Sequence, residues 1–366
     1  MIACLSPNGL NTYPQSGPTT KLLVGTLNGV STLERKGAHG SWRLSGRALE
    51  DLHISSLLWE PGQGGLFAGV HGGGLYFSAD EGQTWTARRH GIPVGHVFSL
   101  ACSRQGGRTR LYAGTEPAGL FCSDTLGEIW EELPSLRGVP DTDKWMFPGP
   151  PHEAHLKTLA IDPRDANRLY AGVEQGALLL STNGGESWRE LDGYARPDDE
   201  VYKDIHLVML RPSNPDEIYM TGGMGLYHSP DKGETWTHLS NRQARVGYPD
   251  QFQFSPADDR TIFMAGAALN PGTWRQSHCA DSTVVSSRDG GHSWEEASTG
   301  LPEHMVGNIE AMALSGDAGG FELFAGTTDG EVYASPDGAA TWSRIAAGLA
   351  PVSKGGHYVP LQAPAA

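Results

Sequence analysis

The sequence predicts an all-β fold, a seven-bladed β-propeller built from four-stranded antiparallel sheets. Three observations predict it: a turn motif that recurs six times, seven short apolar strands that precede or accompany these turns, and a third series of strands that begin with a polar residue. Repeats of roughly 40–50 residues are typical of propeller blades. The 49 Gly and 24 Pro in 366 residues fit many short strands joined by turns.

The turn motif has the pattern S-x-D-x-G-x-T-W. Its copies end at Trp85, Trp130, Trp188, Trp236, Trp294 and Trp342. The Asp or Asn side chain can bond backbone amides within the turn, and Gly takes the position with positive φ. The second copy is degenerate, because its acid, Asp124, stands one place early. We interpret the acids of this motif as hairpin residues and not as catalytic carboxylates.

The two other series predict the inner strands of each blade. The apolar strands have sequences such as Leu111–Thr115 and Leu169–Val173, and seven of them occur. Only six have a polar-led strand before them, so the C-terminal segment His357–Leu361 is predicted to pair into the first blade and close the ring. This predicts one domain over 1–366, with an N-terminal extension at 1–20 and a tail at 362–366. Six or eight blades are the alternatives.

The six turns resemble those of the BNR/Asp-box superfamily, and the resemblance covers nearly the whole chain. Sialidases, sortilin-type receptors, photosystem II assembly propellers and uncharacterised bacterial YVTN/BNR-like proteins share this repeat, and the last group is the most similar in length and pattern. The resemblance implies a fold and not an activity. The F/Y-R-I-P motif of sialidases does not occur in this sequence.

Composition and charge disfavour some classes of binding partner. A formal net charge of −15 without a long basic run disfavours nucleic acid, and no apolar run is long enough to predict a membrane span. The four cysteines, Cys4, Cys102, Cys122 and Cys279, show no CxxC spacing. With no signal peptide evident, these features predict a cytoplasmic protein that acts on a small molecule or ligand, with a protein partner as a further possibility.

One position of the polar-led strands is predicted to form the site. Aligned on their first residue, the seven strands begin with His53, His96, His155, His206, Tyr248, Asn308 and His357. These strands line the axis of a propeller, so the five histidines are predicted to ring one channel mouth and to bind a divalent transition metal, Fe, Mn, Zn or Cu. The alternative is that they line a solvated channel or bind an anionic ligand.

Loops on the same face add candidates. Glu116 and Glu174, together with Tyr248, are predicted to serve in proton transfer. Two long insertions, 134–154 and 267–283, are predicted to wall the pocket. The predicted pocket residues are His71, Trp145, His152, Tyr202, Trp274, Arg275, His278 and Asn308.

These candidates define three functional hypotheses. The first is a metal-dependent enzyme that acts on a small molecule at the histidines, as an oxygenase, a lyase or a hydrolase. The second is a non-catalytic propeller that binds a ligand or a protein. The third is a sialidase-like glycoside hydrolase.

Overall fold

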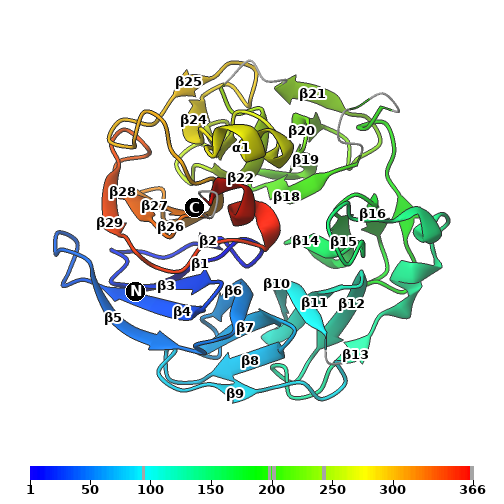
Figure 1. The fold of residues 1–366 in the computed structure, drawn as a ribbon. Coiled ribbons are helices and arrows are strands. Elements are labelled where there is room, and N and C mark those ends of the chain that lie inside the picture. Colours follow the sequence, from blue (N-terminus) through cyan, green and yellow to red (C-terminus); the bar gives the residue numbers. More distant parts are fainter. Residues whose placement is uncertain (93–94, 197–198, 200–202, 241–244, 363–366) are drawn as a thin grey trace. The chain divides into compact units, whose positions relative to one another are not determined.

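The protein, seen in a computed structural model, has seven β-sheets and the fold class of a seven-bladed β-propeller, as predicted (Figure 1). The structure describes all residues except 93–94, 197–198, 200–202, 241–244 and 363–366. The chain divides into two compact units. Unit 1 comprises Met1–Leu57 with Leu239–Ala366, and unit 2 comprises Leu58–His238.

Unit 2 contains four four-stranded sheets that follow one another along the chain, from blue to green in Figure 1. Their strands are β6 (His53–Glu60), β7 (Gly65–His71), β8 (Gly74–Ser78) and β9 (Thr86–Ala87); β10 (His96–Gln105), β11 (Arg108–Glu116), β12 (Gly119–Ser123) and β13 (Glu131–Glu132); β14 (Leu156–Asp162), β15 (Asp165–Val173), β16 (Ala177–Ser181) and β17 (Arg189–Glu190); β18 (Ile205–Arg211), β19 (Asn214–Gly222), β20 (Gly225–Ser229) and β21 (Thr237–Ser240). The unit boundaries fall within β6 and β21. Two 3-10 helices, η1 (Pro134–Gly138) and η2 (Thr142–Lys144), lie in the first insertion.

Unit 1 contains the other three sheets. Their strands are β1 (Ile2–Leu5), β3 (Lys21–Thr26), β4 (Gly29–Glu34) and β5 (Arg43–Ala48); β22 (Tyr248–Phe254), β23 (Ile262–Ala267), β24 (Thr283–Ser287) and β25 (Glu295–Glu296); β2 (Thr12–Tyr13), β26 (Ile309–Asp317), β27 (Gly320–Thr327), β28 (Val332–Ser335) and β29 (Ser343–Ala346). Helix α1 (Pro271–Ser277) lies in the second insertion, and the 3-10 helix η3 (Gly356–Leu361) lies near the C-terminus.

The predicted pairing of the C-terminal segment into the first blade is wrong. Residues His357–Leu361 form part of η3, and the fourth strand of the first sheet is β1, which pairs in parallel with β3. The segment 1–20 therefore supplies strands, because β2 also pairs in parallel with β26 of the last sheet. Pro360 explains part of this outcome, since its missing N–H cannot join a strand ladder.

The second strands of the blades are apolar on both faces because both faces are buried. In β15, Leu169, Ala171 and Val173 belong to one core cluster, whereas Tyr170 between them packs in another. Successive side chains of a strand point to opposite faces, so this strand contributes to the cores on both sides of its sheet. Each fully buried large apolar side chain contributes about 1.5–3 kcal/mol.

The recurring turn closes through its own side chains. In the first copy, Ser78 Oγ accepts from Gly82 N at 2.8 Å, and Asp80 Oδ1 accepts from Thr84 N at 2.8 Å. The hydrogen bonds from Thr84 lower the pKa of Asp80 to about 2. In the degenerate copy the hydroxyl of Thr125 replaces the carboxylate and accepts from Ile129 N at 2.9 Å. The acids are thus hairpin residues.

We expect Gly91→Ala to lower the free energy of unfolding by roughly 1–3 kcal/mol. Gly91 has φ +92°, and a Cβ there would lie 2.0 Å from the carbonyl oxygen of Trp130. Gly106→Ala is the matched control, because Gly106 also has positive φ, at +57°, but a Cβ on Gly106 would meet no described atom within 4 Å. Urea unfolding of both variants measures the difference; equal losses would contradict the contact.

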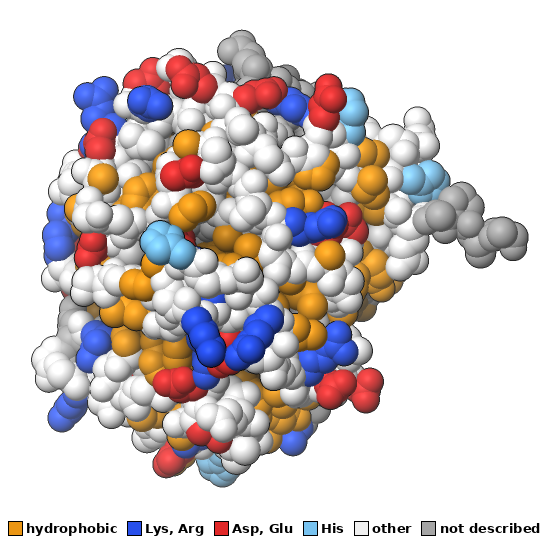
Figure 2. Space-filling view, turned by 90° about the vertical axis from the view of Figure 1, so that its left-hand side faces the viewer, with side chains coloured by type: hydrophobic (Ala, Val, Ile, Leu, Met, Phe, Trp, Pro, Cys, Tyr) orange, Lys and Arg blue, Asp and Glu red, His pale blue; other side chains and the backbone are white. Residues whose placement is uncertain are grey.

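The surface carries mixed charge on the face in Figure 2. Acidic and basic side chains of the described residues are interspersed there with apolar ones. The net charge of −15 is therefore not gathered into a single patch on that face. Among the described residues, no helix has the length and apolar character needed to cross a membrane.

Candidate active site

The predicted site positions fall at the starts of the first strands of their sheets. His53, His96 and Tyr248 are the first residues of β6, β10 and β22. His155 and Asn308 directly precede β14 and β26, and His206 is the second residue of β18. The strand pairings place His96, His155, Tyr248 and Asn308 at one register. The predicted alignment of His206 is wrong by two residues, because Asp204 takes the aligned position there. His357 lies in η3.

His155 is the centre of a buried network in unit 2. Its Nδ1 lies 3.1 Å from Glu116 Oε2, and its Nε2 bonds Glu174 Oε2. Its ring stacks on Phe98 with 3.8 Å between centroids. His155 is 2% exposed, Glu116 6% and Glu174 1%. The two predicted glutamates are therefore brought together through one imidazole.

The network continues from Glu174 to three more buried groups. Lys157 Nζ donates to Glu174 Oε1 at 2.6 Å. His206 Nε2 lies 3.8 Å from the same oxygen and 3.2 Å from Asp204 Oδ2. One oxygen of Glu174, one of Asp204 and one nitrogen of His206 all lie within 4.8 Å of one another. Unit 2 thus buries a close pair of carboxylates between cationic or protonatable partners.

Charge within this network sets the protonation states. Burial lowers the pKa of His155, but the charge of Glu174 and the hydrogen bonds of both glutamates outweigh it, so that pKa is raised. Burial raises the pKa of Asp204, and the charge and hydrogen bond of His206 outweigh it, so that pKa is lowered. Burial also opposes ionisation of Glu116, yet His155 holds its pKa low. His155 is thus favoured as a cation, and both carboxyls are favoured as anions.

We expect stability to decline on both sides of a pH window. Asp204 has a lowered pKa in the folded state, so its contribution is present above its ordinary value of 3.8 and is lost as the pH falls through the folded value. His155 has a raised pKa, so its contribution is present below 6.5 and is lost as the pH rises through the folded value. Urea midpoints measured from pH 3 to 9 test this; a His155→Phe variant that keeps the alkaline decline unchanged would contradict it.

The first insertion covers this network. The Phe147 ring lies 5.0 Å from the His155 ring, centroid to centroid. Met146 N donates to Gln175 O at 3.5 Å, and Trp145 packs against Gly176, where a Cβ would meet its Cγ at 3.1 Å. The segment 145–147, with its two aromatic residues, therefore bonds to and packs against the turn that follows Glu174.

Two histidines and a glutamate form a neighbouring group in unit 2. His96 and Glu116 are direct cross-strand partners in the β10–β11 ladder. His71, at the end of β7, places Nε2 3.8 Å from Glu116 Oε1. Its ring lies against that of His96, with 3.8 Å between centroids and a tilt of 39°. His71 is more open than the rest of the network, with a side chain 26% exposed.

Unit 1 brings other predicted residues into a second polar cluster. Asn308 Nδ2 donates to Asp250 Oδ2 at 2.6 Å, and Lys354 Nζ donates to Asp250 Oδ1 at 3.1 Å. His357 Nδ1 lies 3.3 Å from Glu310 Oε1. Asp250 and Glu310 are each 1% exposed. This cluster also pairs two buried carboxylates, with a lysine between them.

The remaining candidates have other surroundings. In unit 1, Trp274 of α1 is buried and packs against Tyr248 and His357, at 6.4 and 5.7 Å between ring centroids. Arg275 is exposed and His278 is the αL cap of α1. His53 Nε2 contacts Ser353 O at 3.1 Å. In unit 2, exposed His152 contacts its own loop at Phe147 O. Tyr202 lies outside the described residues.

Sequence reasoning missed Lys157, Asp250, Glu310 and Lys354. Three of them stand two residues after an aligned position, namely His155, Tyr248 and Asn308. Side chains two apart on a strand share a face, so alternation was a signal that could have found them. Lys354 lies in an irregular segment between β29 and η3, and no pattern marks it.

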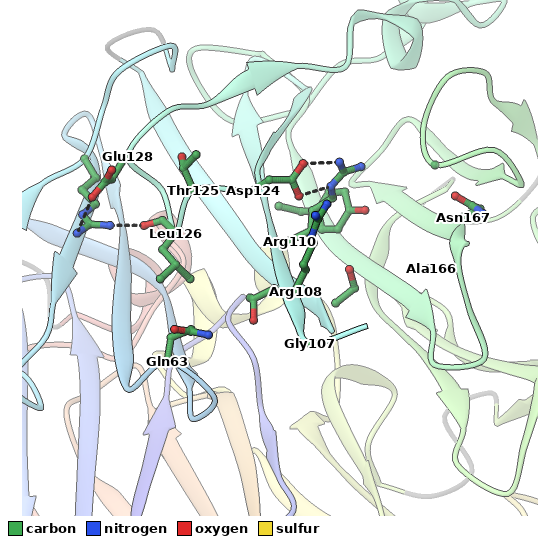
Figure 3. Close-up of a pocket in the computed structure, with 15 residues that line it drawn as sticks. Gln63, Gly107, Arg108, Arg110, Asp124, Thr125, Leu126, Glu128, Ala166 and Asn167 are labelled. Carbon is green, nitrogen blue, oxygen red and sulfur yellow. Dashed lines mark hydrogen bonds and ion pairs between the residues drawn. The ribbon is translucent and has the colours of Figure 1, made fainter. Parts of the chain in front are cut away.

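A separate groove of about 800 Å³ lies among turns of unit 2 and contains none of the predicted site residues (Figure 3). Arg110 forms an ion pair with Asp124 there, and Arg88 forms one with Glu128. This groove therefore does not coincide with the buried network.

Comparisons with known proteins point to carbohydrate-active relatives. A probable oligoxyloglucan-reducing end-specific xyloglucanase of Neosartorya fischeri is 29% identical over 194 residues, which cover 48% of this chain and 22% of that protein. A xyloglucanase of Paenibacillus sp. is 24% identical over 302 residues, covering 72% of this chain and 27% of that protein. The chain thus spans about a quarter of the length of these relatives.

Family and structure comparisons agree on the fold. A family model described as Sortilin-Vps10 (sortilin, neurotensin receptor 3) matches residues 176–309, less than half of the chain. An ancestral GH74 enzyme superposes with a TM-score of 0.60 at 17% identity, covering 77% of this chain and 36% of that one. YCF48 bound to D1 peptide superposes with a TM-score of 0.55 at 13% identity, covering 87% and 89%. These similarities show a β-propeller.

The first functional hypothesis, a metal-dependent enzyme acting on a small molecule, is wrong. Relatives named as xyloglucanases favour a glycoside hydrolase instead. The structure supplies a physical reason at His155 in unit 2: its ring is bonded to Glu174, its raised pKa favours the cation, which cannot ligate a metal, and Lys157 neutralises Glu174. The network thus differs from a ring of neutral imidazoles. The identity of any bound metal stays a prediction.

Proposed function

We propose that the chain is a glycoside hydrolase that cleaves xyloglucan-type polysaccharides. Glu174 and Asp204 are its paired carboxylates. The observation that carries the proposal is their placement, within 4.8 Å of one another, in a network that the segment 145–147 contacts at His155 and at Gly176. Paired carboxylates suit hydrolysis of a glycosidic bond, and aromatic side chains suit the apolar faces of a bound ligand. The named relatives support the substrate class.

The two carboxylates have different roles in this proposal. Asp204, whose pKa is lowered, remains ionised and attacks the anomeric carbon as the glycosidic bond breaks. The proton shared by Glu174 and His155 passes to the leaving oxygen. Water then hydrolyses the glycosyl ester of Asp204 and returns a proton to Glu174. Carboxylate oxygens within 4.8 Å of one another fit this retaining route better than the ~6.5–9.5 Å between the carboxyl groups of inverting enzymes.

Access to these groups requires movement of the covering segment. Glu174 and Asp204 are 1% and 5% exposed. A sugar therefore reaches them after the segment 145–147 has moved from Gly176. The recurring turns support a second assignment, membership of the BNR/Asp-box propellers, because the hydrogen bond that Thr84 N donates to Asp80 recurs from Thr235 N to Asp231.

Incubation of the protein with xyloglucan and its oligosaccharides tests the function. We expect new reducing ends, with the configuration of the anomeric carbon retained in the first product seen by NMR. Folded protein that binds these saccharides without cleaving them would instead support the non-catalytic ligand-binding hypothesis. Neither binding nor cleavage would overturn the assignment.

A further inference from the structure

We propose that His71, His96 and Glu116 form a zinc-binding site in unit 2. It is separate from the carboxylate pair, and it does not rest on the proposed hydrolysis. One ligand atom from each residue lies within 4.8 Å of the others. Two imidazoles and one carboxylate are a donor set that Zn²⁺ takes, with a fourth position open to water. The metal here is a bound ion and has no assigned part in the cleavage of sugars.

The fold fixes two of the three ligands. His96 and Glu116 face each other across the β10–β11 ladder, so their side chains stand on the same face of the sheet. His71 ends β7, whose sheet precedes theirs in the chain, and the turn after it runs close to His96: a Cβ on Gly72 would meet the His96 ring at 3.8 Å. The backbone therefore brings the three side chains together without a long loop.

The distances are close to those of a coordinated ion. Two ligands 2.0–2.1 Å from zinc at a tetrahedral angle lie about 3.4 Å apart. His71 Nε2 and Glu116 Oε1 are 3.8 Å apart. His96 Nδ1 is buried and has no hydrogen-bond partner. In the tautomer with its proton on Nε2, the lone pair of Nδ1 is available to a metal ion. Small rotations of the side chains suffice to close the site.

The surroundings suit a cation. No lysine or arginine forms an ion pair with Glu116 among the described residues, in contrast to Glu174, which bonds Lys157. The second oxygen of Glu116 lies 3.1 Å from His155 Nδ1, and the first oxygen lies on the side of His71, 3.8 Å from its Nε2. The 26% exposure of His71 leaves a path for the ion.

Zinc titration of chelator-treated protein by calorimetry tests this site. We expect one equivalent to bind, and we expect His71→Ala and His96→Ala each to weaken binding at least about tenfold. His292→Ala is the control, because His292 is exposed in a recurring turn of unit 1. Mg²⁺, which prefers oxygen ligands, should not compete. Binding that both site variants retain would overturn the site.

Cobalt provides a readout on the unmodified protein, in case a variant fails to fold. Co²⁺ bound by two imidazoles and a carboxylate in a tetrahedral field gives visible absorption bands, and equimolar Zn²⁺ should abolish them. Absence of these bands at saturating Co²⁺ would contradict the proposal. Hydrolysis of xyloglucan assayed in excess chelator separates the two proposals, because we expect it to persist without metal.

Discussion

Glu174→Gln should lower the rate of xyloglucan cleavage by about 10²–10⁴-fold, the range that a positioned general acid or base contributes. The amide keeps the shape of the side chain but cannot pass a proton to the leaving oxygen. The loss should be much smaller with a synthetic glycoside whose leaving group departs without protonation. Comparison of kcat for the two substrates measures this difference.

Glu153→Gln is the control for that experiment. Glu153 is exposed in the same insertion, two residues before His155, and no described group pairs with it. It should cleave both substrates at the parent rate. A Glu174→Gln variant that loses equal activity on both substrates would contradict the general-acid role, and one that retains full activity would exclude Glu174 altogether.

Lys157→Met should lower the free energy of unfolding by about 3–5 kcal/mol, the usual cost of breaking a buried ion pair from one side. Lys157 and Glu174 are 2% and 1% exposed, so solvent cannot replace the lost partner. The remaining charge of Glu174 would face His155, which bonds it, and His206, which lies 3.8 Å away. Urea unfolding followed by tryptophan fluorescence measures the loss.

Two further variants show whether the loss comes from the ion pair between Lys157 and Glu174. Lys144→Met removes an exposed ion pair with Asp141, whose side chains are 69% and 62% exposed, and should cost under about 1 kcal/mol. The double variant Lys157→Met with Glu174→Gln should lose less than the sum of its parts, because both charges are gone. Additive losses would show that the two side chains do not interact.

The fold was predictable because the same strand and turn patterns recur in nearly every blade. Seven apolar strands give the number of blades, and six turns mark every blade except the first, so a single degenerate copy, such as that at Asp124, changes nothing. The closing strand was not predictable from repeats, because β1 lies in a segment that resembles none of them. The Pro at position 360 was the signal against a C-terminal strand.

The site was predictable in position but not in chemistry. Alignment of strand starts identified His96 and His155, whereas His206 lies two residues after the aligned position, and all three lie in one unit beside carboxylates. What the alignment could not supply was the partner of each imidazole. Glu174 has the cation Lys157 on one side and the anion Asp204 nearby. These contacts depend on how neighbouring sheets pack, which the alignment does not show.

The most direct test of the account is the rate at which Asp204→Asn cleaves a xyloglucan oligosaccharide, measured beside its free energy of unfolding. The account predicts a loss of about 10³-fold or more with both natural and activated substrates, since the nucleophile serves both, while the protein stays folded. Asp192→Asn, an exposed carboxyl in the same unit, should match the parent. Parent-like cleavage by folded Asp204→Asn would contradict the account.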